Sequence, residues 1–229
     1  MKVELQKLEV GYRSRKLIKA LDLEFGPGGL HFLIGSNGSG KSTLMRTIAG
    51  MQDALSGQVL INGTAIQNMN TKFRSKAIHY LRGRQEIRSR ITVSEFLEIA
   101  AGERRLLKRQ RSDWVARLTK AISEVGMKDF LNVAVQQLSD GEFQKMMIAL
   151  VLMRDARVLL LDEPLSHLDP PSQEEMLRLF TKLAQDRTVL ISSHHLHAVQ
   201  LHAKRVFLLN SSQELNELGS FANLIDLYS

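Results

Sequence analysis

A glycine-rich stretch near residue 40 has the composition and spacing of a loop that binds phosphate. The sequence GSNGSGKS, from Gly35 to Ser42, fits the pattern of a glycine, four residues, and then Gly-Lys followed by Ser or Thr. It follows an apolar segment expected to be a strand and leads into an expected helix, which is the context that this pattern requires. A flexible Gly/Ser turn is the alternative, and the flanking elements argue against it.

Each residue type in this loop suits contact with the phosphate chain of a nucleotide. Glycines let the backbone curl so that its N–H groups point inward at phosphate oxygens. Lys41 supplies a mobile positive charge for the β- and γ-phosphates, and the hydroxyl of Ser42 suits Mg²⁺. The expected nucleotide-binding residues of this loop are Gly35, Ser36, Asn37, Gly38, Ser39, Gly40, Lys41, Ser42 and Thr43.

Two adjacent carboxylates follow an unbroken apolar run in the sequence VLLLDEP, from Val158 to Pro164. Such a run is typical of a central parallel strand that is covered on both faces. Its end places Asp162 and Glu163 at the carboxyl edge of the sheet, where α/β folds bind ligands and where the phosphate loop also leaves the sheet. Asp162 is expected to hold Mg²⁺, and Glu163 is expected to orient and polarise an attacking water.

A second candidate anion-binding helix start lies about a hundred residues after the phosphate loop. Ser139, Asp140 and Gly141 precede an apolar-patterned helix, and the first N–H groups of a helix have no partner within it. The same residues also fit an ordinary helix N-cap with Glu142 as the nearby acid. Taken alone, this segment leaves both interpretations open.

Alternating strands and helices position these segments. The unbroken apolar strand and the strand–helix alternation predict an α/β fold with an antiparallel lead-in. The middle of the chain, at about residues 86–150, is helical in period and could form a subdomain. Strands are expected at 2–10, 17–25, 30–35, 57–63, 77–81, 158–161, 188–193 and 205–210, and helices at 41–49, 92–101, 113–125, from 139, from 171 and in the His-rich segment after 193.

The composition of the 229-residue chain is that of a soluble globular protein, with 44% hydrophobic and 24% charged residues. No apolar run reaches the ~20 residues of a membrane-spanning helix, and the charged, alternating start does not resemble a signal peptide. With no cysteine, we expect a cytoplasmic location. The net charge is +7, and residues 72–111 hold 12 Lys or Arg against 4 Glu. This excess fits nucleic acid, anionic lipid, an acidic partner or a plain solvated face.

Four further segments resemble motifs of the ATP-binding cassette (ABC) ATPases. The sequence LSDGE resembles the LSGGQ signature, SHLD resembles the D-loop, SSHHL resembles the switch-histidine segment at His194, and GYRS carries Tyr12 where the family keeps an aromatic ring. Their order and spacing match the family from about residue 3 to residue 210. A phosphate loop alone would indicate only a nucleotide, whereas this ordered set is highly specific.

The resemblance implies a P-loop NTPase core with an antiparallel β lead-in and an inserted α-helical subdomain. The whole chain, 1–229, would be one ABC ATPase domain. Residues 1–85 and 151–229 would form the RecA-like core with its β subdomain, and residues 86–150 would form the helical subdomain that carries the signature.

The resemblance also implies roles for individual residues, with ATP and Mg²⁺ as the cofactors. Two cassettes pair head to tail in this family, so Ser139, Gly141 and Glu142 would contact the γ-phosphate held by a second copy. Tyr12 would stack on adenine, although a plain edge-strand aromatic is the alternative. The implied catalytic residues are Glu163, His194 and Lys41, and the implied metal ligands are Ser42, Asp162 and Gln85.

Other assignments in these segments stay open. The family places a metal-binding glutamine where this chain has Gly83, and the nearby glutamine is Gln85. Either Gln85 reaches the metal after a local shift, or water replaces this ligand. Asp140 replaces the commoner glycine, and its charge would weaken phosphate binding unless the side chain turns away. A metal site on four histidines is a further alternative, which the lack of cysteine and of a carboxylate within the run argues against. These histidines are His194, His195, His197 and His202.

Three functions follow from the resemblance and from the charge. The first is the ATPase subunit of a membrane transporter, most similar to the importers of iron-siderophores, haem and cobalamin. Its expected partners are integral membrane permease subunits, a second copy of the chain and an extracytoplasmic substrate-binding protein, with no nucleic acid. It would lie peripherally on the inner face of the cell membrane. The alternatives are a soluble cassette ATPase that acts on nucleic acid or the ribosome, and a cassette that binds ATP without hydrolysing it.

Overall fold

The computed structural model describes residues 1–82, 89–102, 108–194 and 196–218, with the backbone alone at 108–110 and 196–198. The chain divides into two compact units. The first draws on Met1–Gly83, Ala156–Pro164 and Leu177–Ser229, and the second on Arg84–Asp155 and Leu165–Met176. Each unit is described by itself below.

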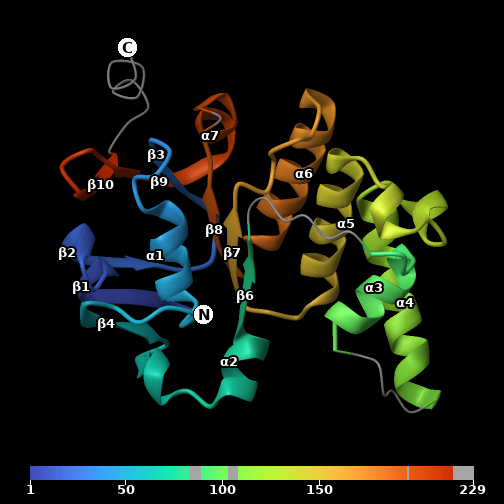
Figure 1. Ribbon diagram of the computed structural model, residues 1–229, viewed down its shortest axis with the longest axis horizontal. Helices are drawn as coiled ribbons and strands as arrows, with labels where there is room; N and C mark the ends of the chain where they lie inside the picture. The colour runs from blue at the N-terminus through green and yellow to red at the C-terminus, as the bar shows by residue number, and fades with distance from the viewer. Residues whose placement is uncertain (83–88, 103–107, 195, 219–229) are drawn as a thin grey trace. The chain divides into compact units, whose positions relative to one another are not determined.

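An antiparallel sheet forms one layer of the first unit (Figure 1). Its strand order is β2-β1-β4-β5. The buried side chains of β1 include Val3 and Leu5, which alternate with more exposed polar residues. The pairing with β2 shifts register between Leu5 and Leu8, and Leu8 beyond the shift is buried as well. The strands are β1 (Val3–Tyr12), β2 (Arg15–Phe25), β4 (Ser56–Ile61) and β5 (Thr64–Ala65).

A second sheet, mostly parallel, forms the other layer, with the strand order β10-β9-β3-β8-β7-β6. All residues of β3, β7 and β8 are buried, which explains their mostly apolar sequences. Among the described strands of this second sheet, only β10 runs antiparallel to its neighbour. The strands are β3 (Leu30–Gly35), β6 (Ile78–Leu81), β7 (Val158–Asp162), β8 (Thr188–Ser192), β9 (Ala203–Leu209) and β10 (Leu215–Leu218).

Helix α1 (Lys41–Ile48) packs against strands of both sheets and joins them into one core. Its buried residues Leu44, Met45 and Ile48 share an apolar cluster with Leu8 of β1 and Leu160 of β7. The helix that follows the phosphate loop is therefore held in place by contacts with both sheets. The first unit also contains a 3₁₀ turn (Ile66–Asn68), α2 (Thr71–Ala77), α7 (Leu196–His202) and the last part of α6 (Pro170–Leu183).

The second unit is helical. Helix α5 packs against both α3 and α4, and α4 buries Trp114, Leu118 and Ile122 at the spacing of one helix face. Thr92 caps α3 through a reciprocal capping box with Glu95. The elements are α3 (Val93–Ala100), α4 (Lys108–Glu124), α5 (Asp140–Met153), the start of α6, and 3₁₀ turns at Lys128–Phe130 and Val135–Gln137.

The α/β fold with its antiparallel lead-in is confirmed, as are β6 at a sheet edge and β7 inside the sheet. The sequence analysis missed α2, β5 and β10, and it began α4 five residues late. Helix α2 buries only Ala77, so it shows no apolar periodicity. Among the described residues, no helix combines the length and apolar character needed to cross a bilayer.

Candidate functional site

The phosphate-loop sequence forms the turn between β3 and α1. Gly38 and Gly40 have φ values of +76° and +115°, a backbone region that favours glycine. Gly35 is required for a different reason, because a Cβ atom there would lie 2.5 Å from the carbonyl oxygen of Leu209 on β9. The loop conformation therefore depends on glycine at these three positions.

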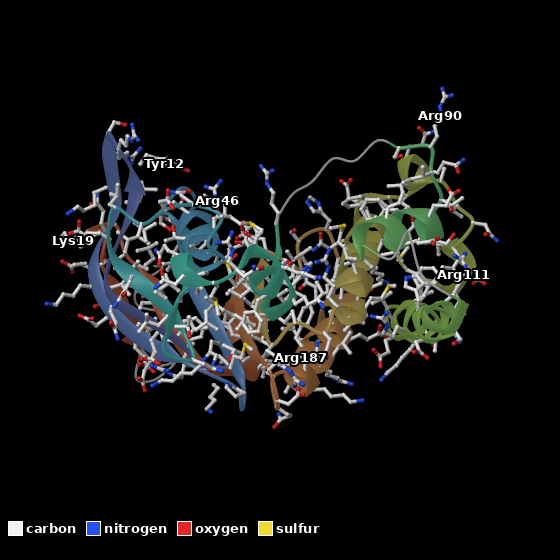
Figure 2. All side chains as sticks on the ribbon, turned by 90° about the horizontal axis from the view of Figure 1, so that it is seen from below. Tyr12, Lys19, Arg46, Arg90, Arg111 and Arg187 are labelled. Atoms are coloured by element: carbon white, nitrogen blue, oxygen red, sulfur yellow. The ribbon has the colours of Figure 1, made fainter. Side chains whose placement is uncertain are left out.

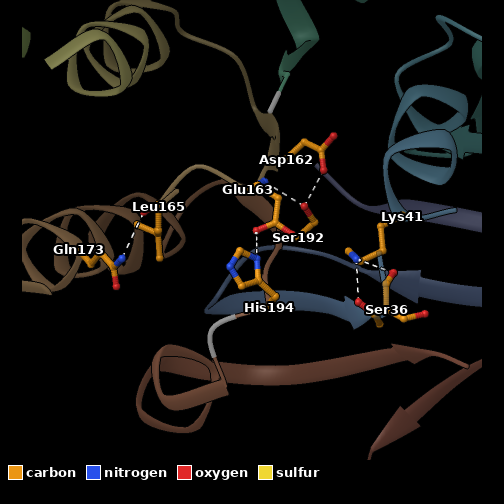
Figure 3. Close-up of polar contacts among 9 residues, drawn as sticks. Ser36, Lys41, Asp162, Glu163, Leu165, Gln173, Ser192 and His194 are labelled. Atoms are coloured by element: carbon orange, nitrogen blue, oxygen red, sulfur yellow. Dashed lines mark hydrogen bonds and ion pairs between the residues drawn. The ribbon is translucent and has the colours of Figure 1, made fainter. Parts of the chain in front are cut away.

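Lys41 is buried at the start of α1 and points back into the loop (Figure 3). Its Nζ donates to the carbonyl oxygens of Gly35, at 2.7 Å, and of Ser36, at 3.1 Å. Burial lowers the pKa of Lys41, while the nearby Glu163 and Asp162 act to raise it. A phosphate group that replaced the two carbonyl oxygens would supply the full negative charge that this buried ammonium group lacks in the loop.

The acidic pair occupies the end of β7, where Asp162 is 4% exposed. Its Oδ1 accepts a hydrogen bond from the Ser192 hydroxyl at 2.6 Å, and its Oδ2 accepts one from the Tyr80 hydroxyl at 3.0 Å. Burial and then the Asp162 charge raise the pKa of Tyr80, so this hydroxyl remains a donor at neutral pH. Two neutral donors therefore stabilise the buried carboxylate from the protein side.

Glu163 follows in a left-handed backbone conformation, with φ +50°. Its backbone N–H donates to the Oγ of Ser192 at 2.9 Å. Its Oε2 lies 2.8 Å from the Nδ1 of His194 (Figure 3). An ionised carboxylate only accepts hydrogen bonds, so Nδ1 is the donor in this contact. The expected base and the expected switch histidine are thus brought together.

These elements surround a pocket of about 380 Å³ in the first unit, which is within the range of small-molecule sites. The sequence analysis missed two of its lining residues, Arg15 and Leu17, and it also missed Ser192 behind the acidic pair. Arg15 is the strand partner of Tyr12 across the β1–β2 turn, a register that the sequence did not specify. The lining residues are Tyr12, Arg15, Leu17, Asn37, Gly38, Gly40, Lys41, Ser42, Thr43, Asp162 and Glu163.

Tyr12 lies at the rim of this pocket with its side chain half-exposed, at 49%. Its hydroxyl oxygen accepts a hydrogen bond from the Nη2 of Arg46 at 2.9 Å, and Figure 2 shows the two residues side by side. Hydrogen bonding with Thr43, and then with Arg46, lowers the pKa of the Tyr12 phenol. The aromatic side chain therefore stands next to the helix that ends the phosphate loop.

The donors for a metal ion are partly described. Ser42 and Asp162 line the same pocket and offer the oxygen ligands that Mg²⁺ prefers, so the residues present fit this ion. Gln85 lies outside the described residues. Within the described part of the chain, no group of three or more His, Cys, Asp or Glu is arranged to hold a metal. Of the four clustered histidines, His195 and the side chain of His197 fall outside that part.

The signature sequence forms the start of α5 in the second unit. The Ser139 Oγ accepts a hydrogen bond from the Glu142 N–H at 3.3 Å. The Glu142 carboxylate accepts from both the N–H and the hydroxyl of Ser139, each at 2.8 Å. The structure therefore contains the reciprocal N-cap that the sequence left open. An anion that takes a hydrogen bond from the Ser139 hydroxyl must displace Glu142.

The loop SHLD lies against this helix start. A Cβ atom on Gly141 would come within 2.9 Å of the carbonyl oxygen of His167, so the close approach needs glycine. The Asp140 Oδ2 lies 3.9 Å from the His167 Nδ1, and the Asp140 side chain is 87% exposed. The carboxylate that the sequence placed near phosphate thus lies within reach of a basic ring.

Comparison with known proteins identifies the family. A family model described as "ABC transporter" matches residues 18–166. The chain is 34% identical over 203 residues to the iron(3+)-hydroxamate import ATP-binding protein FhuC of Bacillus subtilis, covering 87% of this chain and 74% of that one. It is 30% identical over 214 residues to the petrobactin import ATP-binding protein FpuD of Bacillus anthracis, covering 92% and 78%.

A solved structure shows the same fold. A bacterial Atm1-family ABC exporter with ATP bound superposes with a TM-score of 0.84 at 23% identity, covering 100% of this chain and 40% of that one. The P-loop NTPase fold expected from the sequence is therefore confirmed. The chain belongs to the ABC transporter family, and it is an ATP-binding and ATP-hydrolysing subunit of a transporter.

Proposed function

We propose that this chain powers a bacterial importer of ferric siderophores from the inner face of the cell membrane. Relatives named for iron(3+)-hydroxamate and petrobactin import support this cargo class. Integral permease subunits would carry the cargo across the membrane, an extracytoplasmic binding protein would deliver it, and two copies of the chain would bind ATP. The names of these relatives do not favour the alternative of an ATPase acting on nucleic acid or the ribosome.

The contact between Glu163 and His194 is the observation that carries the catalytic part of the proposal. Glu163 lines the pocket beside Lys41, and His194 donates to its carboxylate at 2.8 Å. In the proposed reaction, ATP lies with its triphosphate in the phosphate loop and its adenine against Tyr12. Glu163 accepts a proton from water, the water oxygen bonds to the γ-phosphorus, and the bond to the ADP oxygen breaks.

The neighbours of Glu163 prepare it for this task. Its backbone N–H is anchored on Ser192, and His194 holds one carboxylate oxygen, so the side chain has a defined direction. Ser42 and Asp162 would hold Mg²⁺, which supplies positive charge to the phosphate oxygens when bound. The presence of both Glu163 and His194 argues for hydrolysis rather than for binding alone.

The second copy would complete the site through its signature. Ser139, the N–H of Gly141 and the positive end of the α5 dipole suit contact with the γ-phosphate, and Glu142 would release the Ser139 hydroxyl when the anion arrives. The reaction would then depend on the pairing of two chains. Such pairing lets ATP binding and hydrolysis drive closure and opening of the permease.

Substitution Glu163→Gln tests the catalytic proposal, because an amide keeps the shape of the side chain but cannot accept the proton. We expect phosphate release to fall by at least about 100-fold, within the range for loss of a general base. We also expect ATP to trap a dimer, seen as a doubled mass in size-exclusion chromatography. Phosphate release near the wild-type rate would rule out Glu163 as the base.

The cargo proposal needs a separate test in cells that carry the complete transporter. Uptake of a radiolabelled ferric hydroxamate should stop when the Glu163→Gln chain replaces the wild-type chain. The chain should also co-purify with a polytopic membrane protein rather than with RNA or DNA. ATP-dependent uptake of another cargo, with none of the iron complex, would reject the siderophore assignment while leaving the ATPase intact.

A further inference from the structure

The aromatic side chain of Tyr12 stands at the end of a hairpin, where few neighbours restrain it. Tyr12 is the last residue of β1 and pairs with Arg15, the first residue of β2, across the turn. Its side chain is 49% exposed. A half-exposed ring at a hairpin tip samples several side-chain rotamers unless another group holds it.

Arg46 supplies such a restraint from a more rigid part of the molecule. It lies on α1, which packs against both sheets, and its Nε is buried. Its Nη2 donates to the Tyr12 hydroxyl at 2.9 Å and to the Oγ1 of Thr43 at 3.3 Å. Thr43 is itself 5% exposed. One planar guanidinium group therefore connects the hairpin tip to the first turn of α1. Tyr12 and Arg46 are labelled in Figure 2.

We propose that Arg46 is a positioning residue that holds the ring of Tyr12 ready for the adenine base. The inference rests on the proposed function, in which Tyr12 stacks on adenine. A ring already held by its hydroxyl loses less conformational freedom when the base stacks on it. Arg46 thus contributes to the preference for ATP over a triphosphate without a base, although it bonds the hydroxyl of the ring and is not among the residues that line the pocket.

The effect is large enough to measure. Immobilising one flexible side chain on binding costs a factor of about 2 to 10 in affinity, and this is the loss expected when Arg46 no longer restrains the ring. The loss should appear in the dissociation constant and in KM for ATP. The kcat of Arg46→Met at saturating ATP should stay the same, because the reacting phosphate lies at the other end of the nucleotide.

The test compares Arg46→Met, Tyr12→Phe and the double variant in the full-length chain. Tyr12→Phe keeps the ring and removes the hydroxyl, which bonds with Arg46 and with Thr43. Each single variant should weaken ATP binding by about 2- to 10-fold, and the double variant should be no weaker than either. Inorganic tripolyphosphate, which has no base, should compete for the pocket equally well in all variants. That equal competition also shows that the phosphate loop is folded.

Two results would overturn the proposal. The first is an additive loss in the double variant, which would mean that Arg46 acts independently of the Tyr12 hydroxyl. The second is an equal loss for tripolyphosphate and ATP in Arg46→Met, which would mean that the positive charge acts on phosphate. Tyr12→Ala separates this inference from the proposed function, because unchanged ATP affinity there would show that Tyr12 does not contact the base at all.

Discussion

Ser192 connects the two carboxylates of the acidic pair, and its removal should impair both stability and turnover. Its hydroxyl donates to the Asp162 Oδ1 at 2.6 Å, and its Oγ accepts the Glu163 N–H at 2.9 Å. Ser192 is fully buried, with no exposed area. Ser192→Ala therefore removes two contacts at once without a change of backbone type.

The expected magnitudes follow from these contacts. A hydrogen bond to a charged acceptor contributes about 1.5–3 kcal/mol, and Asp162 is too buried for water to replace the lost donor easily. Glu163 holds a left-handed backbone conformation that costs about 1–2 kcal/mol. After the substitution its backbone N–H retains the longer 3.3 Å bond to the Ser192 carbonyl oxygen. We expect the free energy of unfolding to fall by about 2–4 kcal/mol.

Turnover should fall further than a general loss of stability would explain. If the freed Glu163 leaves its catalytic position, and returning it adds about 1.4–2.7 kcal/mol to the activation free energy, kcat falls by about 10- to 100-fold. The assay is phosphate release at saturating ATP and at a temperature where urea unfolding curves show that the variant is folded. The same curves give the change in stability.

Thr188→Val is a matched control on the same strand. Thr188 begins β8, is fully buried, and its hydroxyl donates to the Met1 carbonyl oxygen, whereas Ser192 ends that strand at the site. The control should lose about 1–2 kcal/mol of stability and keep its kcat. If Ser192→Ala turned over ATP within twofold of wild type at a similar loss of stability, the hydroxyl would have only a structural role and the reasoning would be refuted.

Two further predictions concern the second unit and the core. Gly141→Ala should lower ATP turnover and cost about 1–3 kcal/mol of stability, because its Cβ would meet the His167 carbonyl oxygen at 2.9 Å. Gly26→Ala is the control, because a Cβ there would meet only the Lys2 Cα at the ordinary distance of 3.9 Å, and its turnover should stay unchanged. Equal kcat values for the two variants would contradict the steric argument. His31 is buried against Phe25 and Phe207, and burial lowers its pKa below the usual 6.5. His31 therefore binds its proton more weakly in the folded chain than in the unfolded chain. The free energy of unfolding should fall as the pH drops through 6.5 and should become constant below the folded-state pKa of His31. Urea unfolding at about pH 7.5 and about pH 5.5 should show a smaller difference for His31→Gln than for wild type, and equal differences would exclude His31 as the source.

The sequence was sufficient for the phosphate loop and for the acidic pair, whose chemistry lies in consecutive residues. The phosphate loop needs its glycines, lysine and serine in one turn, and the flanking strand and helix are visible from local apolar patterns. Asp162 ends β7 and Glu163 follows it, and the unbroken apolar run before Asp162 placed both at the ligand edge of the sheet. The expected position of each of these residues is the one that the structure shows.

Local patterns could not show contacts that depend on which strands become neighbours. Ser192 meets Asp162 across 30 residues, and Arg46 meets Tyr12 across 34, because β7 pairs with β8 and the β1–β2 hairpin lies beside α1. Helix α2 was invisible for a related reason, since a helix that buries one residue leaves no apolar period.

By itself, then, the sequence determined the residue types that can bind a triphosphate and the local turns that present them. Only the tertiary structure decided the partners of those residues: the serine bonded to the Glu163 N–H, the histidine bonded to the Glu163 carboxylate and the arginine bonded to the Tyr12 hydroxyl. The physical reason is that backbone propensity and apolar periodicity act over a few residues. Side-chain hydrogen bonds, in contrast, depend on strand register and helix packing, which the whole core sets together.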